Sequence, residues 1–409
     1  MKATGAVDAV DVVALGESMV TFLPTRPGRL ADVPSFDRAI GGAESNVACA
    51  LAAAGHAVRW VSRVGADGFG AHLLETVASY GVDVSYVGRD PVRPTGVYFR
   101  TAGDRATDAH EVAYYRAGSA ASAMSAATVD PAAVRAGRIL HLSGITAALS
   151  EGCLGLLREL TASAGERPTL VSFDVNYRPG LWTGSDGAEV LLELARRADI
   201  VFVGEDEAEQ AWGVGGGPAA IRELLPEPEV LVVKQGGAGA TAFVSAAARW
   251  GLAAQFPAPL TGRCPAASLP AAQLRAGVPQ GGTGGRWGSP RPKAGGGTPP
   301  ARASETPPPT PGTFEPAPAV DVVATVGAGD AFAAGFLSGI LRGLPVGQTL
   351  RLGHLFAAAA LTTPADLAPP PARDTTDRLT ALDAGAWERL RLGPGWTEAD
   401  AAEEEVRTP

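Results

Sequence analysis

The sequence predicts an α/β protein with a doubly wound, mainly parallel sheet flanked by helices. Short runs rich in Val, Ile and Leu alternate along the chain with segments of helical character, which is the order typical of parallel strands joined by helices. Polar or glycine-rich segments directly follow several of these runs. Because ligands bind beyond the carboxyl ends of parallel strands, we expect these segments to share one site.

The composition is typical of a globular protein and argues against several classes of function. The chain has 409 residues, of which 46% are hydrophobic and 19% charged, enough for one large domain or two smaller ones. The net charge of −9 disfavours binding to nucleic acid or to an anionic membrane. Three widely separated cysteines, no signal-like N-terminus and no apolar run of membrane-span length predict a cytoplasmic protein without a disulfide framework or a structural zinc site.

The N-terminal part of the chain is expected to form a strand, a glycine turn and a helix. Val10–Leu15 reads as a buried first strand. Residues 41–46, Gly-Gly-Ala-Glu-Ser-Asn, then precede an Ala-rich helix over 47–54. A glycine pair lets the backbone approach a ligand closely, and the polar residues after it are available for contacts with that ligand. One of them could equally serve as an ordinary helix cap.

The rest of the chain continues the alternation of strands and helices. Apolar runs expected to be strands cover 58–64, 140–142, 170–173, 200–203 and 230–234, and helices are expected over 70–80 and 350–361. Residues 92–115 alternate in polarity, which favours a small sheet or flap outside the main core. Charged residues close three of the strands, in Asp-Val-Asn-Tyr-Arg at 174–178, Gly-Glu-Asp-Glu at 204–207 and Lys-Gln-Gly-Gly at 234–237.

Residues 324–335 carry the pattern most suggestive of chemistry. A glycine-rich turn precedes an apolar helix with small residues at helical spacing. Unpaired backbone N–H groups and the helix dipole make such a helix start a site for an anion. Asp330 in the first turn would repel that anion unless it accepts a proton from an attacking hydroxyl group, as phosphoryl transfer requires. The alternative is an ordinary N-terminal Asp on a glycine-started helix.

Residues 260–318 interrupt the alternation of strands and helices. The segment is rich in Pro and Gly and lacks periodicity, which predicts a disordered insert without a catalytic role. Similar x-Pro-Ala-Pro segments at 256–259 and 315–318 bracket it, and joining them would leave a short hairpin. We interpret the segment as an insertion, or as a frame-shifted or mis-annotated stretch of the gene. Residues 391–409 are expected to form an acidic tail.

With these residues placed, the chain resembles the ribokinase-like (PfkB) carbohydrate kinase family over roughly residues 10–258 and 319–385. The family resemblance rests on Gly-Gly-Ala-Glu-Ser-Asn-Val-Ala at 41–48 and Gly-Ala-Gly-Asp at 327–330. Within the family, the chain looks most like the 2-keto-3-deoxygluconate kinases. That resemblance rests on Gly-Glu-Ser-Met at 16–19, Tyr-Tyr-Arg-Ala-Gly-Ser-Ala-Ala at 114–121, His-Leu-Ser-Gly-Ile-Thr at 141–146 and Asp-Val-Asn-Tyr-Arg at 174–178.

The resemblance implies a ribokinase-like fold with a small β lid. The kinase domain would comprise residues 8–258 and 319–390, with the lid drawn from about 17–40 and 92–118. It implies a sugar-acid kinase that uses ATP and Mg²⁺ to phosphorylate a primary hydroxyl group of 2-keto-3-deoxygluconate, and a homo-oligomer, since members of this family often dimerise through the lid.

The resemblance also implies a role for individual residues. Asp330 would be the general base, and the N–H groups of Gly327, Ala328 and Gly329 the anion hole. The implied substrate-binding residues are Gly42, Ala43, Glu44, Asn46, Tyr98, Tyr114, Arg116, Arg178 and Asp366. The implied ATP-binding residues are Asn176, Arg178, Gly204, Lys234, Gly236, Gly237, Gly239, Gly327, Gly329 and His354. Glu207 would organise Mg²⁺ through water, and Arg116 suits a substrate carboxylate because a guanidinium group matches its geometry.

Three positions depart from the family pattern, and other functions remain open. Ala324 replaces an Asp that helps to hold a monovalent cation, which leaves activation by such a cation doubtful. Gly204 stands where Asn or Ser is usual, and His354 where Asn is usual, so we expect altered rather than abolished catalysis. The alternatives are a kinase for a neutral sugar, fructose or ribose, and a catalytically weakened sugar-binding homologue. An NAD-linked oxidoreductase is disfavoured, because no Gly-x-Gly-x-x-Gly follows the first strand.

Overall fold

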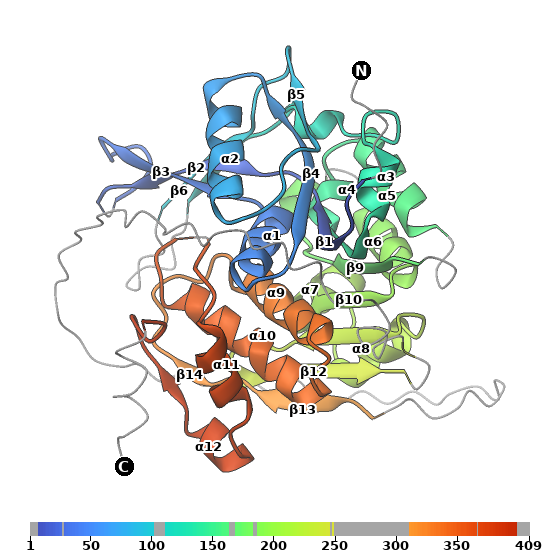
Figure 1. Ribbon diagram of the computed structural model, residues 1–409, viewed down its shortest axis with the longest axis vertical. Coiled ribbons are helices and arrows are strands. Elements are labelled where there is room, and N and C mark those ends of the chain that lie inside the picture. The colour runs from blue at the N-terminus through green and yellow to red at the C-terminus, as the bar shows by residue number, and fades with distance from the viewer. Residues whose placement is uncertain are drawn as a thin grey trace. The chain divides into compact units, whose positions relative to one another are not determined.

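The main sheet has nine strands in the order β13-β12-β11-β10-β9-β8-β1-β4-β5 (Figure 1). The computed structural model describes residues 7–26, 28–101, 111–162, 168–182, 186–245, 248, 311–365 and 367–398, so the predicted insert falls outside it up to residue 310. The strands are β1 (Val10–Leu15), β4 (Val58–Gly65), β5 (Val87–Asp90), β8 (Gly137–Ser143), β9 (Leu170–Asp174), β10 (Ile200–Gly204), β11 (Val230–Lys234), β12 (Gly239–Val244) and β13 (Thr313–Pro316). From β11 to β5 neighbouring strands run parallel, whereas β12 and β13 are antiparallel additions at one edge.

Helices cover both faces of this sheet. Because side chains alternate along a strand, β1 contributes Val12 and Ala14 to one core and Val13 and Leu15 to another. The first core also contains residues of α1, α2, α9 and α10, and the second contains residues of α5 and α6. The helices are α1 (Ala43–Ala53), α2 (Gly68–Ser79), α3 (Pro131–Arg135), α4 (Gly144–Ala147), α5 (Glu151–Thr161), α6 (Gly187–Arg196), α7 (Glu205–Trp212), α8 (Pro218–Leu224), α9 (Ala328–Leu341), α10 (Val346–Leu361), α11 (Arg373–Thr380) and α12 (Ala384–Glu388), with 3₁₀ turns at Ala121–Ala123, Pro179–Leu181 and Gly236–Ala238.

A separate four-stranded sheet, here called the lid, lies beside the main sheet. It consists of β2 (Met19–Pro24), β3 (Phe36–Gly41), β6 (Val97–Arg100) and β7 (Val112–Tyr115), in the order β3-β2-β6-β7. Aromatic rings pack between its strands, with the Phe22 and Phe99 ring centroids 4.8 Å apart. The four strands fall within residues 19–41 and 97–115.

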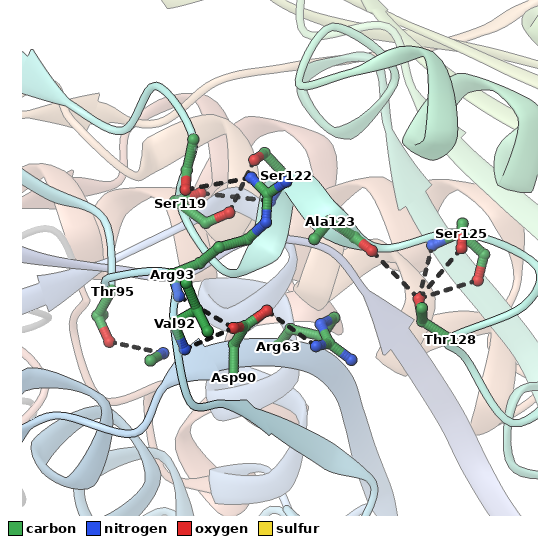
Figure 2. A network of polar contacts seen from close by, with 12 residues as sticks. Arg63, Asp90, Val92, Arg93, Thr95, Ser119, Ser122, Ala123, Ser125 and Thr128 are labelled. Carbon is green, nitrogen blue, oxygen red and sulfur yellow. Dashed lines mark hydrogen bonds and ion pairs between the residues drawn. The ribbon is translucent and has the colours of Figure 1, made fainter.

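Figure 2 shows a polar network where the lid joins the main sheet. The carboxylate of Asp90, at the end of β5, accepts hydrogen bonds from the backbone N–H groups of Val92 (3.0 Å) and Arg93 (2.9 Å) and from Arg63 Nη2 (2.9 Å). Arg93 Nη1 in turn donates to the carbonyl oxygen of Gly118, 3.4 Å away. The segments that enter and leave the lid are therefore tied to each other and to the main sheet.

The C-terminal part of the described chain packs against the body. β14 (Ala319–Val320) pairs in parallel with β15 (Arg391–Leu392), and Trp387 and Trp396 are buried in a cluster with residues of α10. Residues 391–398, expected to belong to an acidic tail, are therefore packed, because Leu392 and Trp396 supply apolar surface. Similarly, residues 313–316, expected to belong to the insert, form the edge strand β13. Among the described helices, none is both long and apolar enough to cross a membrane.

Candidate active site

A cavity of about 490 Å³ lies where the lid faces the carboxyl ends of the main strands. It is lined from the lid and β1–β2 side by Glu17, Met19, Tyr98, Arg100, Val112, Tyr114 and Arg116, and from β3 and α1 by Gly41, Gly42, Ala43 and Asn46. From the strand ends and the turn before α9 it is lined by Ile145, Asp174, Asn176, Arg178, Glu207, Lys234, Thr325, Val326, Gly327, Gly329 and Asp330. The predicted clustering of polar groups at one edge of the sheet is found here.

The turn before α9 places a carboxylate beside a helix N-terminus. Gly327 caps the helix with φ 79°, a left-handed conformation that favours glycine. Asp330 follows in the first turn, and its Oδ2 accepts a 2.9 Å hydrogen bond from Asn46 Nδ2 of α1. Burial raises the pKa of Asp330 to about 7, with a further rise from the Asp174 carboxylate, while the Asn46 hydrogen bond and the Lys234 charge oppose the rise. Near neutral pH this carboxyl group can therefore both accept and hold a proton.

Beside Asp330, an ion pair joins the ends of β9 and β11, the two strands that flank β10. Lys234 Nζ at the end of β11 lies 3.1 Å from both carboxylate oxygens of Asp174 at the end of β9, whose side chain is 3% exposed. Burial alone would lower the pKa of Lys234, but the carboxylates of Asp174, Glu207 and Asp330 together raise it above its usual range. Lys234 is therefore a cation held among three carboxylates.

Two buried amide oxygens at the cavity have no hydrogen-bond partner within the described part of the chain. They are Oδ1 of Asn46 and Oδ1 of Asn176. Asn176 also has φ 41°, an uncommon conformation for a residue other than glycine that turns the chain sharply after β9. Because buried polar atoms are nearly always hydrogen-bonded, these oxygens are suited to receive hydroxyl or water protons of a ligand.

The lid contributes cations and aromatic rings to the cavity. Tyr98 and Arg100 lie two residues apart on β6, and Tyr114 and Arg116 are two residues apart at the end of β7. Arg100 Nη2 donates to the carbonyl oxygen of Pro364 in the body, 3.3 Å away. Arg116 is paired with Glu17. The arginines thus give the lid side of the cavity a capacity to bind anions or polar oxygens.

A model of the pfkB family of carbohydrate kinases matches the chain over residues 9–255 and 306–373. The chain belongs to the pfkB family. It is therefore a carbohydrate kinase, an enzyme that transfers a phosphoryl group to an alcohol group, and its family implies the use of ATP.

Named relatives and a solved structure agree with the family assignment. The 2-dehydro-3-deoxygluconokinase of Bacillus subtilis (strain 168) is 30% identical over 369 residues, covering 89% of this chain and 94% of that protein. The 2-dehydro-3-deoxygluconokinase of Thermoproteus tenax is 32% identical over 237 residues, covering 57% and 72%. A crystal structure of a PfkB protein from Polaromonas sp. JS666 matches with 28% identity and a TM-score of 0.65, covering 91% of this chain and all of that one. The predicted family and fold class are confirmed.

Most, but not all, of the site residues expected from the sequence line the cavity of this pfkB kinase. Those that line it are Gly42, Ala43, Asn46, Tyr98, Tyr114, Arg116, Asn176, Arg178, Glu207, Lys234, Gly327, Gly329 and Asp330. Those that do not are Glu44, Gly204, Gly236, Gly237, Gly239, Ala328 and His354, while Asp366 lies outside the described residues.

Glu44 points away from the cavity. In α1, Ala43 and Asn46 are three residues apart and share a helix face, whereas Glu44 is rotated by about 100° from Ala43. Its Oε1 accepts hydrogen bonds from Ser143 Oγ (2.8 Å) and Thr146 Oγ1 (2.6 Å), and burial raises the pKa of its carboxyl group. Glu44 therefore joins α1 to the end of β8 in this structure rather than facing the cavity.

His354 and the three glycines after β11 also lie elsewhere. His354 is 5% exposed, its Nε2 lies 3.1 Å from the carbonyl oxygen of Glu315, and burial lowers its pKa to about 4. Gly236 and Gly237 are exposed, and Gly239 begins β12. Of the expected nucleotide contacts, those on the turn after β11 and on α10 thus lie outside the cavity.

Sequence reasoning missed Glu17, Arg100 and Asp174 as cavity residues. Strand alternation could have found Arg100, because it lies two residues after Tyr98 and so shares its face. Glu17 and Asp174 stand inside motifs that carried the resemblance, but their partners are about 60 to 100 residues away in the sequence. Only the folded chain shows those pairings.

The carboxylates at the cavity fit contact with a Mg²⁺ ion that is held mainly by phosphates and water. Among the described residues, no group of three or more His, Cys, Asp or Glu could hold a metal by itself. Glu207 lines the cavity, and its Oε2 accepts a hydrogen bond from the N–H of Gly204. Burial raises the pKa of Glu207, so a nearby cation would stabilise its charged form. Mg²⁺ commonly binds through one or two carboxylates, waters and phosphates.

Proposed function

We propose that this pfkB kinase phosphorylates 2-keto-3-deoxygluconate, also called 2-dehydro-3-deoxygluconate, with Asp330 as general base. The observation that carries the proposal is one cavity with Asp330 and the glycine turn at the start of α9 on the body side and two arginines on the lid side. The similarity to two 2-dehydro-3-deoxygluconokinases supports the choice of substrate.

The proposed reaction is an in-line displacement at the γ-phosphorus atom of ATP. Asp330 accepts the proton of the substrate's primary hydroxyl group while the hydroxyl oxygen forms its bond to phosphorus. The bond between that phosphorus and the β–γ bridging oxygen breaks, and ADP leaves. N–H groups of Gly327, Ala328 and Gly329 stabilise the charge on the transferring group. The pKa of Asp330 at about 7 suits a base that works near neutral pH.

The remaining contacts divide between the two substrates. We assign the sugar acid to the turn at Gly42 and Ala43, to the free amide oxygen of Asn46 and to the lid, where a guanidinium group can bind its carboxylate. We assign the phosphates of ATP to Lys234, Asn176 and Arg178, all of which line the cavity. Glu207 would hold Mg²⁺ through water, and the ion would neutralise charge on the β- and γ-phosphates.

An assay of ADP release with Mg-ATP tests the proposal. The sugars would be 2-keto-3-deoxygluconate, its galactonate epimer, fructose and ribose. We expect the highest kcat/KM with a keto-deoxy acid, and a loss of roughly 10²- to 10⁴-fold in kcat for Asp330→Asn, since it removes the base without changing side-chain size. Asp374→Asn, which changes an exposed carboxylate in α11, is the matched control and should retain full activity.

Two results would contradict the proposal. A higher kcat/KM with fructose or ribose would make the protein a neutral-sugar kinase, and Arg116→Ala should then have little effect on KM. Substantial activity of Asp330→Asn would show that Asp330 is not the general base. Rapid turnover of a keto-deoxy acid, abolished only in Asp330→Asn, would support both parts.

A further inference from the structure

The segment Gly-Glu-Ser-Met at 16–19 carries part of the sequence resemblance, but the proposed reaction gives it no task. Its glutamate lies between β1 and β2 and lines the cavity. We propose that Glu17 is a positioning residue that holds the guanidinium group of Arg116 in the orientation that binds the sugar substrate. This inference rests on the proposed role of Arg116 in sugar binding.

Both carboxylate oxygens of Glu17 are engaged. Oε2 accepts a hydrogen bond from Arg116 Nε at 2.8 Å and forms an ion pair with Arg116 Nη2, 2.5 Å away. Oε1 accepts a hydrogen bond from Ser119 Oγ at 2.5 Å. The Glu17 side chain is 1% exposed. A carboxylate so buried and so fully bonded has little freedom to turn, so it defines the place of the groups that bond to it.

The contact with Glu17 leaves part of the Arg116 fork available. A guanidinium group has five N–H donors, of which the Nε–H donates a hydrogen bond to Glu17, while Nη2 is its ion-pair contact. Within the described chain, the Arg116 side chain has no other hydrogen bond to protein, and its guanidinium carbon lies 5.8 Å from the centre of the Tyr114 ring. Because Arg116 lines the cavity, its remaining donors on Nη1 and Nη2 can reach a ligand oxygen in a plane already set by Glu17.

The backbone around Glu17 links it to both sides of the cavity. A Cβ atom on Gly96 of the lid would lie 3.0 Å from Glu17 Oε1. A side chain on Gly42, a proposed sugar contact, would overlap the carbonyl oxygen of Glu17. These close approaches are possible because both residues are glycines. Glu17 therefore fixes Arg116 relative to the glycine turn as well as to the lid.

The pairing predicts an effect on sugar binding more than on chemistry. Glu17 neutralises the charge of Arg116 and so does not increase its attraction for an anion. Its contribution is to orient the Arg116 guanidinium group. An arginine without Glu17 would have to lose side-chain freedom when substrate binds. We therefore expect loss of Glu17 to raise KM for the sugar, with little change in kcat or in KM for ATP.

A double-mutant cycle tests whether Glu17 acts through Arg116. The variants are Glu17→Asp, which keeps the charge but withdraws it by one methylene group, Arg116→Ala, and the two combined. Ser119→Ala is the matched control, because it removes the other partner of Glu17 and leaves Arg116 in place. The kinetic constants are measured for whichever sugar of the four gives the highest kcat/KM.

We expect Glu17→Asp and Arg116→Ala each to raise KM for the sugar about tenfold or more, the range of losing a charge-assisted hydrogen bond. The double variant should be no worse than Arg116→Ala. Ser119→Ala should change KM less than about twofold. Additive effects of the two substitutions, or an unchanged KM in Glu17→Asp, would overturn the proposal.

A spectroscopic measurement separates this inference from the proposed function. The Nε–H signal of Arg116, identified by its loss in Arg116→Ala, should exchange slowly with water in the wild type and in Ser119→Ala, and faster in Glu17→Asp. Equal exchange in wild type and Glu17→Asp would overturn the role of Glu17 even if no sugar is turned over. A neutral sugar as best substrate would reject the sugar-acid function, and Arg116→Ala should then leave KM nearly unchanged. In that case the exchange rate of the Arg116 Nε–H decides the role of Glu17 by itself.

Discussion

At the scale of single residues, the properties of the site are set by charges that meet only in the folded chain. Asp330 is ordinary as a sequence feature, an acid in the first turn of a helix. Burial beside Asp174 raises its pKa to about 7, while Lys234 and Asn46 hold the rise in check. Its proton affinity therefore depends on the ends of β9 and β11 as much as on its own helix.

The first prediction at this scale concerns the pH dependence of activity. If Asp330 is the base in the enzyme that has not yet bound sugar, kcat/KM for the sugar should rise with pH on an acid limb whose apparent pKa lies near 7. Lys234→Met should move this limb to higher pH, because it removes a nearby positive charge. Asp174→Asn should move it to lower pH, because it removes a nearby negative charge. Each profile is measured from pH 5 to 9 with saturating Mg-ATP.

The opposite signs make this prediction specific. A general loss of structure in the two variants would lower kcat/KM at all pH values without moving the limb in opposite directions. Lys234→Arg, which retains the charge, serves as the control and should leave the limb near its wild-type position. Shifts of the same sign in Lys234→Met and Asp174→Asn would show that a group other than Asp330 controls the acid limb.

At the scale of elements, strand and helix positions followed from sequence pattern, but helix packing did not. The strand Val10–Leu15 was predicted with its observed bounds, since a β-branched run ending in glycine has a strong local signal. The small residues of α9 were read as part of a helix start. The structure shows that Gly335 and Gly339 lie against α10, where a Cβ on Gly335 would lie 2.5 Å from the Leu352 carbonyl oxygen. Periodicity cannot identify the partner of a helix face.

This close contact predicts a cost for a substitution that usually stabilises helices. Gly335→Ala should lower the free energy of unfolding by about 1–3 kcal/mol, because the added methyl group must displace the backbone of α10. Gly155→Ala, in α5 where no atom lies within 4 Å of the added Cβ, should raise it by about 0.5–1 kcal/mol. Urea unfolding of both variants measures the difference. Equal free energies of unfolding for the two variants would contradict the prediction, because they would mean that α10 moves to accommodate the methyl group without cost.

At the scale of the whole molecule, burial makes acidic and basic groups respond to pH in opposite ways. Burial raises the pKa of Asp330 to about 7, above its value of roughly 3.9 in an unfolded chain. Between these values the native state binds a proton that the unfolded state does not, so Asp330 contributes stability as pH falls. Burial lowers the pKa of His354 to about 4, below roughly 6.5 in the unfolded chain. Between these two values the unfolded state binds a proton that the native state does not. His354 therefore lowers the free energy of unfolding as pH falls from roughly 6.5 to about 4.

Urea unfolding at pH 7.5, 6 and 5 tests both signs. Asp330→Asn should be more stable than the wild type at pH 7.5, on the order of 2 kcal/mol, because a buried charge is removed. The advantage should shrink toward pH 5, where the native carboxyl group is already protonated. For His354→Gln the trend should be opposite: its free energy of unfolding should increase relative to that of the wild type as pH falls. A pH-independent difference for either variant would contradict the buried titration assigned to it.

Taken alone, the sequence determined the fold class and the family, and it singled out the two glycine turns, at 41–46 and 327–330, that contribute to the cavity. These properties are local, because strand runs, glycine turns and helix starts have signals within about ten residues. The tertiary structure decided which side chains face the cavity: Asn46 does and Glu44 does not, and Glu17, Arg100 and Asp174 join the site from outside the expected set. It also decided that residues 391–398 pack against the body. The reason is that a side chain's orientation and its charge partner depend on segments far away in the chain, which contact it only after folding.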